Sequence, residues 1–178
     1  MSEEDDLFAS GGEASQFIRY APQSKKWKSN GEELSIHQIA LDFSTLKPGW
    51  GIWPEGQAIT WTFGSKPSVL PEKPSDQHKQ GFHIEAYIPE DKTMVKKTWS
   101  SMTFGERETI KLMYRQVKDQ VKANPNKIAV YSFDGASENM KVGAGNTNYA
   151  KCTFKGFSDK PDAEVEDTSN DDPIFDID

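Results

Sequence analysis

The chain has 178 residues, a formal net charge of -7 and a mean hydropathy of -0.74, which predicts one polar domain without a membrane span, because no apolar run approaches ~20 residues. The acidic N-terminus lacks the apolar segment of a secretory signal, and the single cysteine cannot form an internal disulfide. We therefore expect a cytoplasmic protein. One Cys and three scattered His show no ligand spacing, so neither a metal nor a cofactor is expected.

The charge is unevenly distributed along the chain. The first fourteen residues hold five acids and no base, and the last seventeen hold eight acids and no base. Residues 15–161 hold all 21 Lys and Arg and 15 of the 28 acids, a net charge of +6. Such charge blocks are typical of disordered tails around a folded body. We therefore expect a disordered acidic segment over 1–16, a folded domain over 17–158 and a disordered acidic tail over 159–178.

Strands are expected in the first half of the folded domain. Alternating apolar residues predict strands over 35–43, 58–63 and 82–88, because successive side chains of a strand point to opposite faces. Residues 47–56 contain three glycines and two prolines and are predicted to form a loop, although they include two tryptophans. Residues 64–81 hold three prolines and are predicted to form a second, longer loop.

The second half is expected to hold one helix between strands. Thr103 and Glu106 fit a capping box at the start of a helix over 104–123, and an apolar stripe follows at spacings of three and four. The remaining expected elements are a short extra strand over 93–99 and two strands over 127–133 and 149–157. The order predicts a mainly β chain, an OB-fold-like β-barrel with its helix between the third and fourth main strands.

Sequence motifs of enzymes are missing from the chain. There is no GxxxxGK[ST], no GxGxxG after a strand and no GxSxG. Cys152 alternates with apolar residues, which favours a small core residue over a nucleophile. We therefore expect a protein that is not an enzyme and has no catalytic residues.

The folded domain combines aromatic rings with a surplus of lysine. Single-stranded nucleic acid is held by rings on which bases stack, each worth roughly 1–3 kcal/mol, and by cations that follow the phosphates. In an OB-fold the loops between the first two and the last two strands flank the binding face. The candidate nucleic-acid-binding residues are Trp50, Trp53, Tyr87, Trp99, Tyr131, Lys47, Lys96, Lys97, Lys151 and Lys155.

The C-terminus ends with Asp171, Asp172, Pro173, Ile174 and Phe175, followed by three further residues. This resembles the acidic tip of bacterial single-stranded DNA-binding proteins, in which a run of Asp precedes Ile, Pro and a final Phe. In outline the chain also resembles the single-stranded DNA-binding proteins of tailed phages, an OB-fold body followed by a disordered acidic tail. The resemblance implies that the tail recruits replication and repair enzymes and competes with DNA for the basic groove. Two differences are the swapped Pro173 and Ile174 and the absence of a terminal carboxylate on Phe175.

The sequence therefore predicts a non-catalytic protein that binds single-stranded DNA in replication or recombination. The resemblance implies that a phage encodes it, which would place it in the cytoplasm of the host cell. The protein's partners would be the DNA itself and enzymes that bind the tail at residues 171–175.

Two alternatives stay open. The first is a β-rich interaction or virion protein, in which Trp50, Trp53 and Trp99 pack against a protein or a sugar ring. The second is a metal-dependent nuclease, because acids on strands can converge on a metal ion. Its candidate ligands are Asp42, Glu85 and Asp134.

Overall fold

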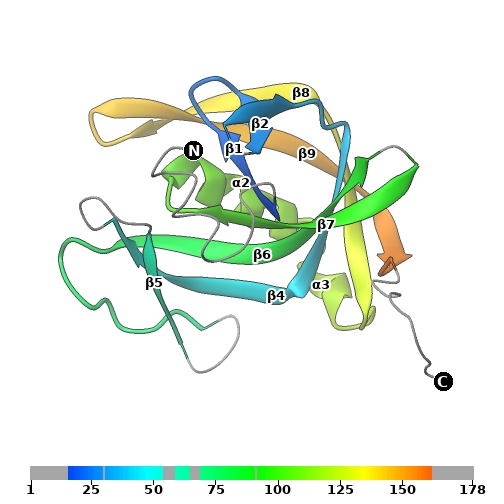
Figure 1. Cartoon of the computed structure of the whole chain (residues 1–178), viewed down its shortest axis with the longest axis horizontal. Helices are drawn as coiled ribbons and strands as arrows, with labels where there is room; N and C mark the ends of the chain where they lie inside the picture. Colours follow the sequence, from blue (N-terminus) through cyan, green and yellow to red (C-terminus); the bar gives the residue numbers. More distant parts are fainter. Residues whose placement is uncertain (1–15, 30, 54–58, 65–68, 91, 162–178) are drawn as a thin grey trace, which may run out of the picture.

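A computed structural model describes residues 16–29, 31–53, 59–64, 69–90 and 92–161 (Figure 1). Within this part, the chain forms nine strands and two helices. They are β1 Phe17–Ala21, β2 Lys26–Ser29, β3 Glu32–Leu34, β4 Gln38–Ile52, β5 Thr60–Phe63, β6 Lys79–Glu90, β7 Thr93–Ser101, α2 Phe104–Arg115, α3 Lys118–Val121, β8 Lys127–Val142 and β9 Gly145–Asp159.

The nine strands form one mixed sheet, curled into a half-barrel. Their order is β3-β2-β1-β7-β6-β4-β8-β9, and β5 pairs with β4 beside this path. β1 runs parallel to β7, and the other strand pairs are antiparallel. The main helix, α2, follows β7 (Figure 1). The prediction of a mainly β chain with one main helix is confirmed.

The central strands are connected as a Greek key. β4, β6 and β7 pair antiparallel in succession, and the chain then passes through α2 before β8 pairs with the other edge of β4. The spatial order β8-β4-β6-β7 places the fourth strand beside the first, as this motif requires. The main helix therefore lies between the third and fourth strands of the motif.

The first long strand extends through residues that the sequence analysis assigned to a loop. β4 continues to Ile52, beyond a bulge between Asp42 and Lys47. Gly49 is needed here because a Cβ in its place would lie 2.6 Å from Cδ1 of Phe63 on the neighbouring strand. The prediction of a loop over 47–56 is therefore wrong for 47–52, where glycine permits close packing within the sheet.

Two other predicted elements differ in extent. The expected short strand over 93–99 is the nine-residue β7, which pairs with β6 along its whole length. The strand expected over 58–63 is only the four-residue β5, beside the main path of the sheet. The expected helix ends at Arg115, because Val117 leaves the helical conformation with φ -128° before the short α3.

A hairpin arm replaces the loop that was expected between the last two strands. β8 and β9 stay paired from Ser137 with Ala150 to Val142 with Gly145, and they extend from the sheet as a two-stranded arm (Figure 1). Only two residues connect them, and Gly143 has φ +59°, as the first position of a type II′ turn requires. The Gly/Asn-rich composition of 134–148 therefore reflects the turn and the exposure of the arm.

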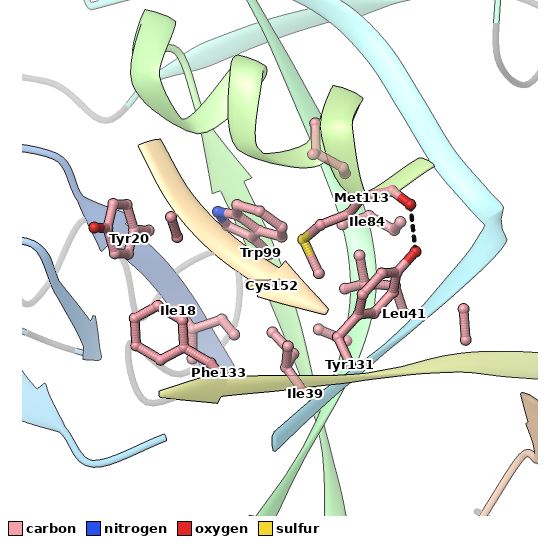
Figure 2. Close-up of a cluster of buried hydrophobic side chains, with 14 of the residues drawn as sticks. Ile18, Tyr20, Ile39, Leu41, Ile84, Trp99, Met113, Tyr131, Phe133 and Cys152 are labelled. Atoms are coloured by element: carbon pink, nitrogen blue, oxygen red, sulfur yellow. Dashed lines mark hydrogen bonds between the residues drawn. The ribbon is translucent and has the colours of Figure 1, made fainter. Parts of the chain in front are cut away.

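The core lies between the curled sheet and α2. Ile39 and Leu41 of β4 and Ile84 of β6 are fully buried there, together with Met113 of α2 (Figure 2). Their alternation along the strands and the apolar stripe of the helix were predicted from the sequence, and both are confirmed.

The N-terminal strands complete this core with two aromatic rings. Tyr20 of β1 and Trp27 of β2 are cross-strand partners with ring centroids 5.4 Å apart, and Trp27 lies 5.0 Å from Trp99 of β7. The sequence analysis did not predict strands before residue 35. Trp27 stands between two lysines in a strand of four residues, which is too short to show an alternating apolar pattern. Its burial therefore could not be read from the sequence.

Candidate nucleic-acid interface

Three of the five predicted stacking rings belong to the core. Trp99 and Tyr131 are 0% exposed and Tyr87 is 3% exposed. The Tyr131 hydroxyl donates to the carbonyl of Met113 at 2.5 Å (Figure 2), and burial raises the pKa of this phenol. Tyr87 packs on the opposite face of the sheet with Ala40 and Ile128. Neighbouring side chains cover all three rings, so the structure corrects their interpretation to core residues.

The other two rings are accessible and lie near the end of β4. Trp53 is 63% exposed. Trp50 is partly buried, and its indole Nε1 donates to the carbonyl of Pro71 at 2.7 Å. Its strand partner is Gln80 of β6, and paired residues project from the same face of a sheet. Trp50 therefore has a fixed orientation and an accessible ring.

Trp50 lines an open cavity of about 670 Å³. The cavity lies where the end of β4, the segment leading into β6 and the start of α2 come together. Its lining residues are Trp50, Lys73, Asp76, Gln77, His78, Lys79, Gln80, Met102, Phe104 and Arg107. Small-molecule pockets in proteins are typically ~300–1,000 Å³, so the space is large enough for a nucleotide.

The cavity combines positive charge with aromatic rings. Lys73, Lys79 and Arg107 line it, against a single acid, Asp76. The Lys73 ammonium lies 5.6 Å from the centroid of the Trp50 ring. Cations beside aromatic faces are the combination that holds the phosphates and bases of a single strand.

Arg107 is held in place from two sides. Its Nη1 donates to Oε1 of Gln80 at 3.3 Å, and its guanidinium carbon lies 5.1 Å from the centroid of the Phe104 ring. Its Nε is buried and has no hydrogen-bond acceptor among the described residues. Burial lowers the pKa of Arg107, but a guanidinium remains charged at neutral pH. The side chain therefore presents an oriented positive charge at the cavity.

The start of α2 is fixed by Glu106, the neighbour of Arg107. Thr103 caps the helix as predicted, since its Oγ1 accepts from the Glu106 amide at 3.2 Å. The second half of the predicted capping box is wrong, because the Thr103 amide donates to Oγ of Ser101 at 2.9 Å instead of to Glu106. The carboxylate of Glu106 turns into the core.

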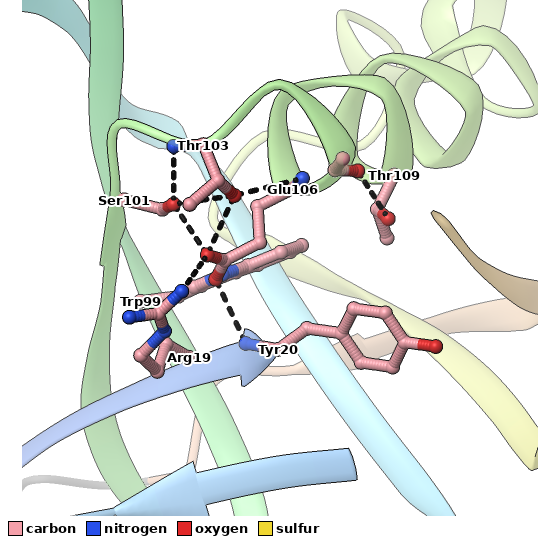
Figure 3. A network of polar contacts seen from close by, with 8 residues as sticks. Arg19, Tyr20, Trp99, Ser101, Thr103, Glu106 and Thr109 are labelled. Carbon is pink, nitrogen blue, oxygen red and sulfur yellow. Dashed lines mark hydrogen bonds and ion pairs between the residues drawn. The ribbon is translucent and has the colours of Figure 1, made fainter. Parts of the chain in front are cut away.

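The buried carboxylate of Glu106 joins α2 to β1 and β7 (Figure 3). It accepts from the Tyr20 amide at 2.8 Å, from Trp99 Nε1 and Thr103 Oγ1 at 2.9 Å, from Arg19 Nη2 at 3.2 Å and from Ser101 Oγ. Burial raises the pKa of Glu106, and Arg19 and the hydrogen bonds oppose this rise. The network holds the first turn of α2, and with it Arg107, against the sheet.

The predicted lysines do not line the cavity and are dispersed over the body. Lys47 lies 5.9 Å from the centroid of the Phe63 ring, on the face of the sheet that holds His83. Lys97 forms an ion pair with Glu90 at 3.3 Å, and the exposed Lys151 forms one with Glu138 at 3.8 Å. Lys96 and Lys155 are exposed as well.

The acids of the nuclease alternative are only partly brought together. Asp42 and Glu85 are cross-strand partners, but Asp42 is buried and forms an ion pair with Lys160 at 2.7 Å. Asp134 lies on β8 and accepts from the Ala136 amide. In the part of the chain that the structure describes, no three His, Cys, Asp or Glu residues form a group that could hold a metal ion.

The cavity-lining residues that sequence reasoning did not name are Lys73, Lys79, Phe104 and Arg107. They come from a polar loop, the first residue of a strand and the first turn of a helix. No local pattern shows that these segments meet, because the contacts join residues far apart in the chain. The predicted tail residues 171–175 lie outside the described residues.

No helix within the described ranges is both long and apolar enough to cross a membrane. Neither a protein-family model, nor a curated protein, nor a solved structure matches the chain.

Proposed function

We propose that this chain is a non-catalytic, single-stranded DNA-binding protein with an OB-like body, acting in the cytoplasm in replication or recombination. The observation that carries the proposal is the cavity beside Trp50, where a ring predicted to stack on bases meets Lys73, Lys79 and Arg107. Such a site binds without reading sequence, because every base has a flat face and every nucleotide a phosphate.

The strand order supports the OB-like assignment. β4, β6, β7, β8 and β9 are consecutive apart from the short β5, and α2 lies between the third and fourth of them. In an OB-fold the loop between the first two strands flanks the nucleic-acid face. Here the segment between β4 and β6 supplies Lys73, Asp76 and His78 to the cavity. The fold proposal and the site proposal therefore point to the same surface.

We also propose a role for the acidic tail. The last seventeen residues carry eight acids and no base, whereas residues 15–161 carry a net charge of +6. The tail would be attracted to the body and would compete with DNA there. Ile174 and Phe175 supply a short apolar anchor through which a replication or recombination enzyme would bind.

The test is a titration of fluorescein-labelled dT20 and of a duplex with the full chain and with a variant that lacks 162–178. This truncation keeps Lys160, which pairs with Asp42. We expect tighter binding of the single strand than of the duplex, a log–log salt slope of about -0.7 per phosphate neutralised, and tighter binding after truncation. The proposal fails if neither protein binds dT20 at low salt.

Exposed apolar residues favour a second candidate, a protein-interaction module. Trp53, Val69 and Leu70 are large apolar residues with exposed side chains. A module of this kind would bind a protein or glycan and would not bind dT20 in the same titration. Adding Mg²⁺ to the labelled strand tests the nuclease alternative, since only a nuclease would shorten it.

A further inference from the structure

We infer that the cavity beside Trp50 is a subsite for one nucleotide, with the base against the Trp50 ring and the phosphate beside Lys79 and Arg107. This inference rests on the proposed function and specifies which part of the strand the cavity takes. Three features support it: an oriented ring, an arginine held in place by two neighbours, and a space of nucleotide size.

The base would bind at Trp50. The hydrogen bond from its indole to the Pro71 carbonyl, 2.7 Å long, fixes the plane of the ring. The Lys73 ammonium lies over the ring face, 5.6 Å from its centroid, where a stacked base would bind. A base that stacks on this face would displace the Lys73 ammonium from the ring.

The phosphate would bind at Arg107. Gln80 and Phe104 hold the guanidinium, so little side-chain entropy is lost when it binds an anion. The Nε of Arg107 is closed to solvent, so a phosphate would contact the terminal guanidinium nitrogens, of which Nη1 already donates to Gln80. Lys79, one residue before Gln80, adds a second cation. A phosphate oxygen would therefore gain a charge-assisted hydrogen bond and an ion pair.

Size and charge agree with one nucleotide. The cavity of about 670 Å³ has three cations and one acid in its lining, and a nucleotide carries one or two negative charges. A free nucleotide and a nucleotide unit within a strand have the same chemistry, so the test includes both. We assign the cavity to a unit within a strand because the proposed ligand is single-stranded DNA.

The first experiment measures the binding of fluorescein-labelled dT12 to the full chain. Trp50→Leu removes the ring, whereas Trp50→Phe keeps a smaller one; Arg107→Gln removes the charge. We expect Trp50→Leu to weaken binding about 5- to 150-fold, the range for one stacked base, and Trp50→Phe to lose much less. We expect Arg107→Gln to weaken it about 10- to 150-fold, the range for a hydrogen bond to a charged group. Lys111→Gln is the matched control for Arg107→Gln, because Lys111 is an exposed residue of the same helix paired with Glu108, and it should change binding less than twofold.

Competition identifies the ligand chemistry. Unlabelled dTMP should displace dT12 at a concentration at least tenfold lower than thymidine or inorganic phosphate, because only dTMP supplies both a base and a phosphate. If Trp50→Leu and Arg107→Gln bind both ligands as the wild type does, the inference is wrong.

A crosslink keeps the test decisive if a variant does not fold. A dT12 strand that carries one 5-iododeoxyuridine, irradiated with the full wild-type chain, should attach to Trp50 or Phe104, as mapped by mass spectrometry. Binding of dT12 with crosslinks only elsewhere would overturn the subsite and leave the proposed function standing. Binding of dTMP alone would support the subsite and overturn the proposed function, and binding of neither would overturn both.

Discussion

The side chain of Gln116 occupies the place of a neighbouring strand beside Phe154. Its Oε1 accepts from the Phe154 amide and its Nε2 donates to the Cys152 carbonyl, both at 2.9 Å. β9 is the last strand in the order of the sheet, so its outer edge presents unpaired amides and carbonyls. The side-chain oxygen of Thr109, on α2, accepts from the Ala150 amide at 2.9 Å. Side chains of α2 and of its C-cap residue Gln116 thus cover an edge that a closed barrel would pair with another strand.

Replacing Gln116 with Ala should therefore destabilise the fold. Both hydrogen bonds at the edge of β9 would be lost, and each is worth about 0.5–1.5 kcal/mol. We expect the free energy of unfolding to fall by roughly 1–2 kcal/mol in urea titrations followed by circular dichroism, although Ala is the better helix former. Gln120→Ala is the control, since Gln120 lies in α3 and is exposed. Equal stabilities of the two variants would show that the edge contacts contribute nothing.

Replacing Glu106 with Gln should cost more. The carboxylate accepts from five donors, and an amide nitrogen in place of one oxygen would face donors that it cannot accept from. Hydrogen bonds to a charged group are worth about 1.5–3 kcal/mol, so we expect a loss of roughly 3 kcal/mol in the same urea titration. Glu108→Gln is the matched control and should lose under about 0.5 kcal/mol, because its ion pair with Lys111, three residues along the same helix, is of the kind that contributes little to stability. A loss as small as that of the control would contradict the structural role of Glu106.

Local patterns predicted the parts of the fold that depend on neighbours in sequence. The Thr103 cap and the stripe that includes Ile110 and Met113 follow from residues three or four apart. The burial of Trp27 and the continuation of β4 through Gly49 do not, because both depend on strands distant in the chain. Glycine and proline predict a loop unless a neighbouring ring needs the space that the missing side chain leaves.

The sequence predicted the residue types of the candidate site but not which residues would lie together. Sequence reasoning named Trp50 as a stacking ring and expected lysine nearby. The cations that share its cavity are Lys73, Lys79 and Arg107, from three segments that only the fold brings together. Conversely, Trp99 and Tyr131 look equivalent to Trp50 by residue type, and the structure places them in the core.

A methyl group added at Gly81 should disrupt the sheet. A Cβ there would overlap the Ser101 carbonyl and lie 2.6 Å from Cη2 of Trp61. We expect Gly81→Ala to lower the free energy of unfolding by about 1–3 kcal/mol, the usual cost of overpacking. Gly145→Ala is the control, because a Cβ at Gly145 comes no closer than 3.8 Å to Val142 O. A melting temperature of Gly81→Ala within a degree of the control would show that the sheet has room at this position.

The free energy of unfolding should decrease as the pH is lowered, because of His83. Its ring packs edge-on against the stacked rings of Trp61 and Phe63, with centroid distances of 4.6 and 4.9 Å, and its buried Nε2 has no hydrogen-bond partner among the described residues. Burial, and then the charge of Lys47, lowers the pKa of His83 from 6.5 to about 4. As pH falls below about 6.5, His83 becomes protonated in the unfolded chain but stays neutral in the folded chain. The free energy of unfolding therefore declines until about pH 4, where the folded chain is protonated too.

The expected loss over this window is up to roughly 3 kcal/mol, since each pKa unit corresponds to about 1.4 kcal/mol. His83→Gln removes the titrating group and keeps a polar side chain. Carboxylates titrate over part of the same window, so the quantity to compare is the difference between wild type and variant in urea titrations from pH 7.5 to 4. That difference should change steadily below pH 6.5 and stay constant above it. Parallel profiles over the whole range would show that the pKa of His83 is the same in the folded and the unfolded chain.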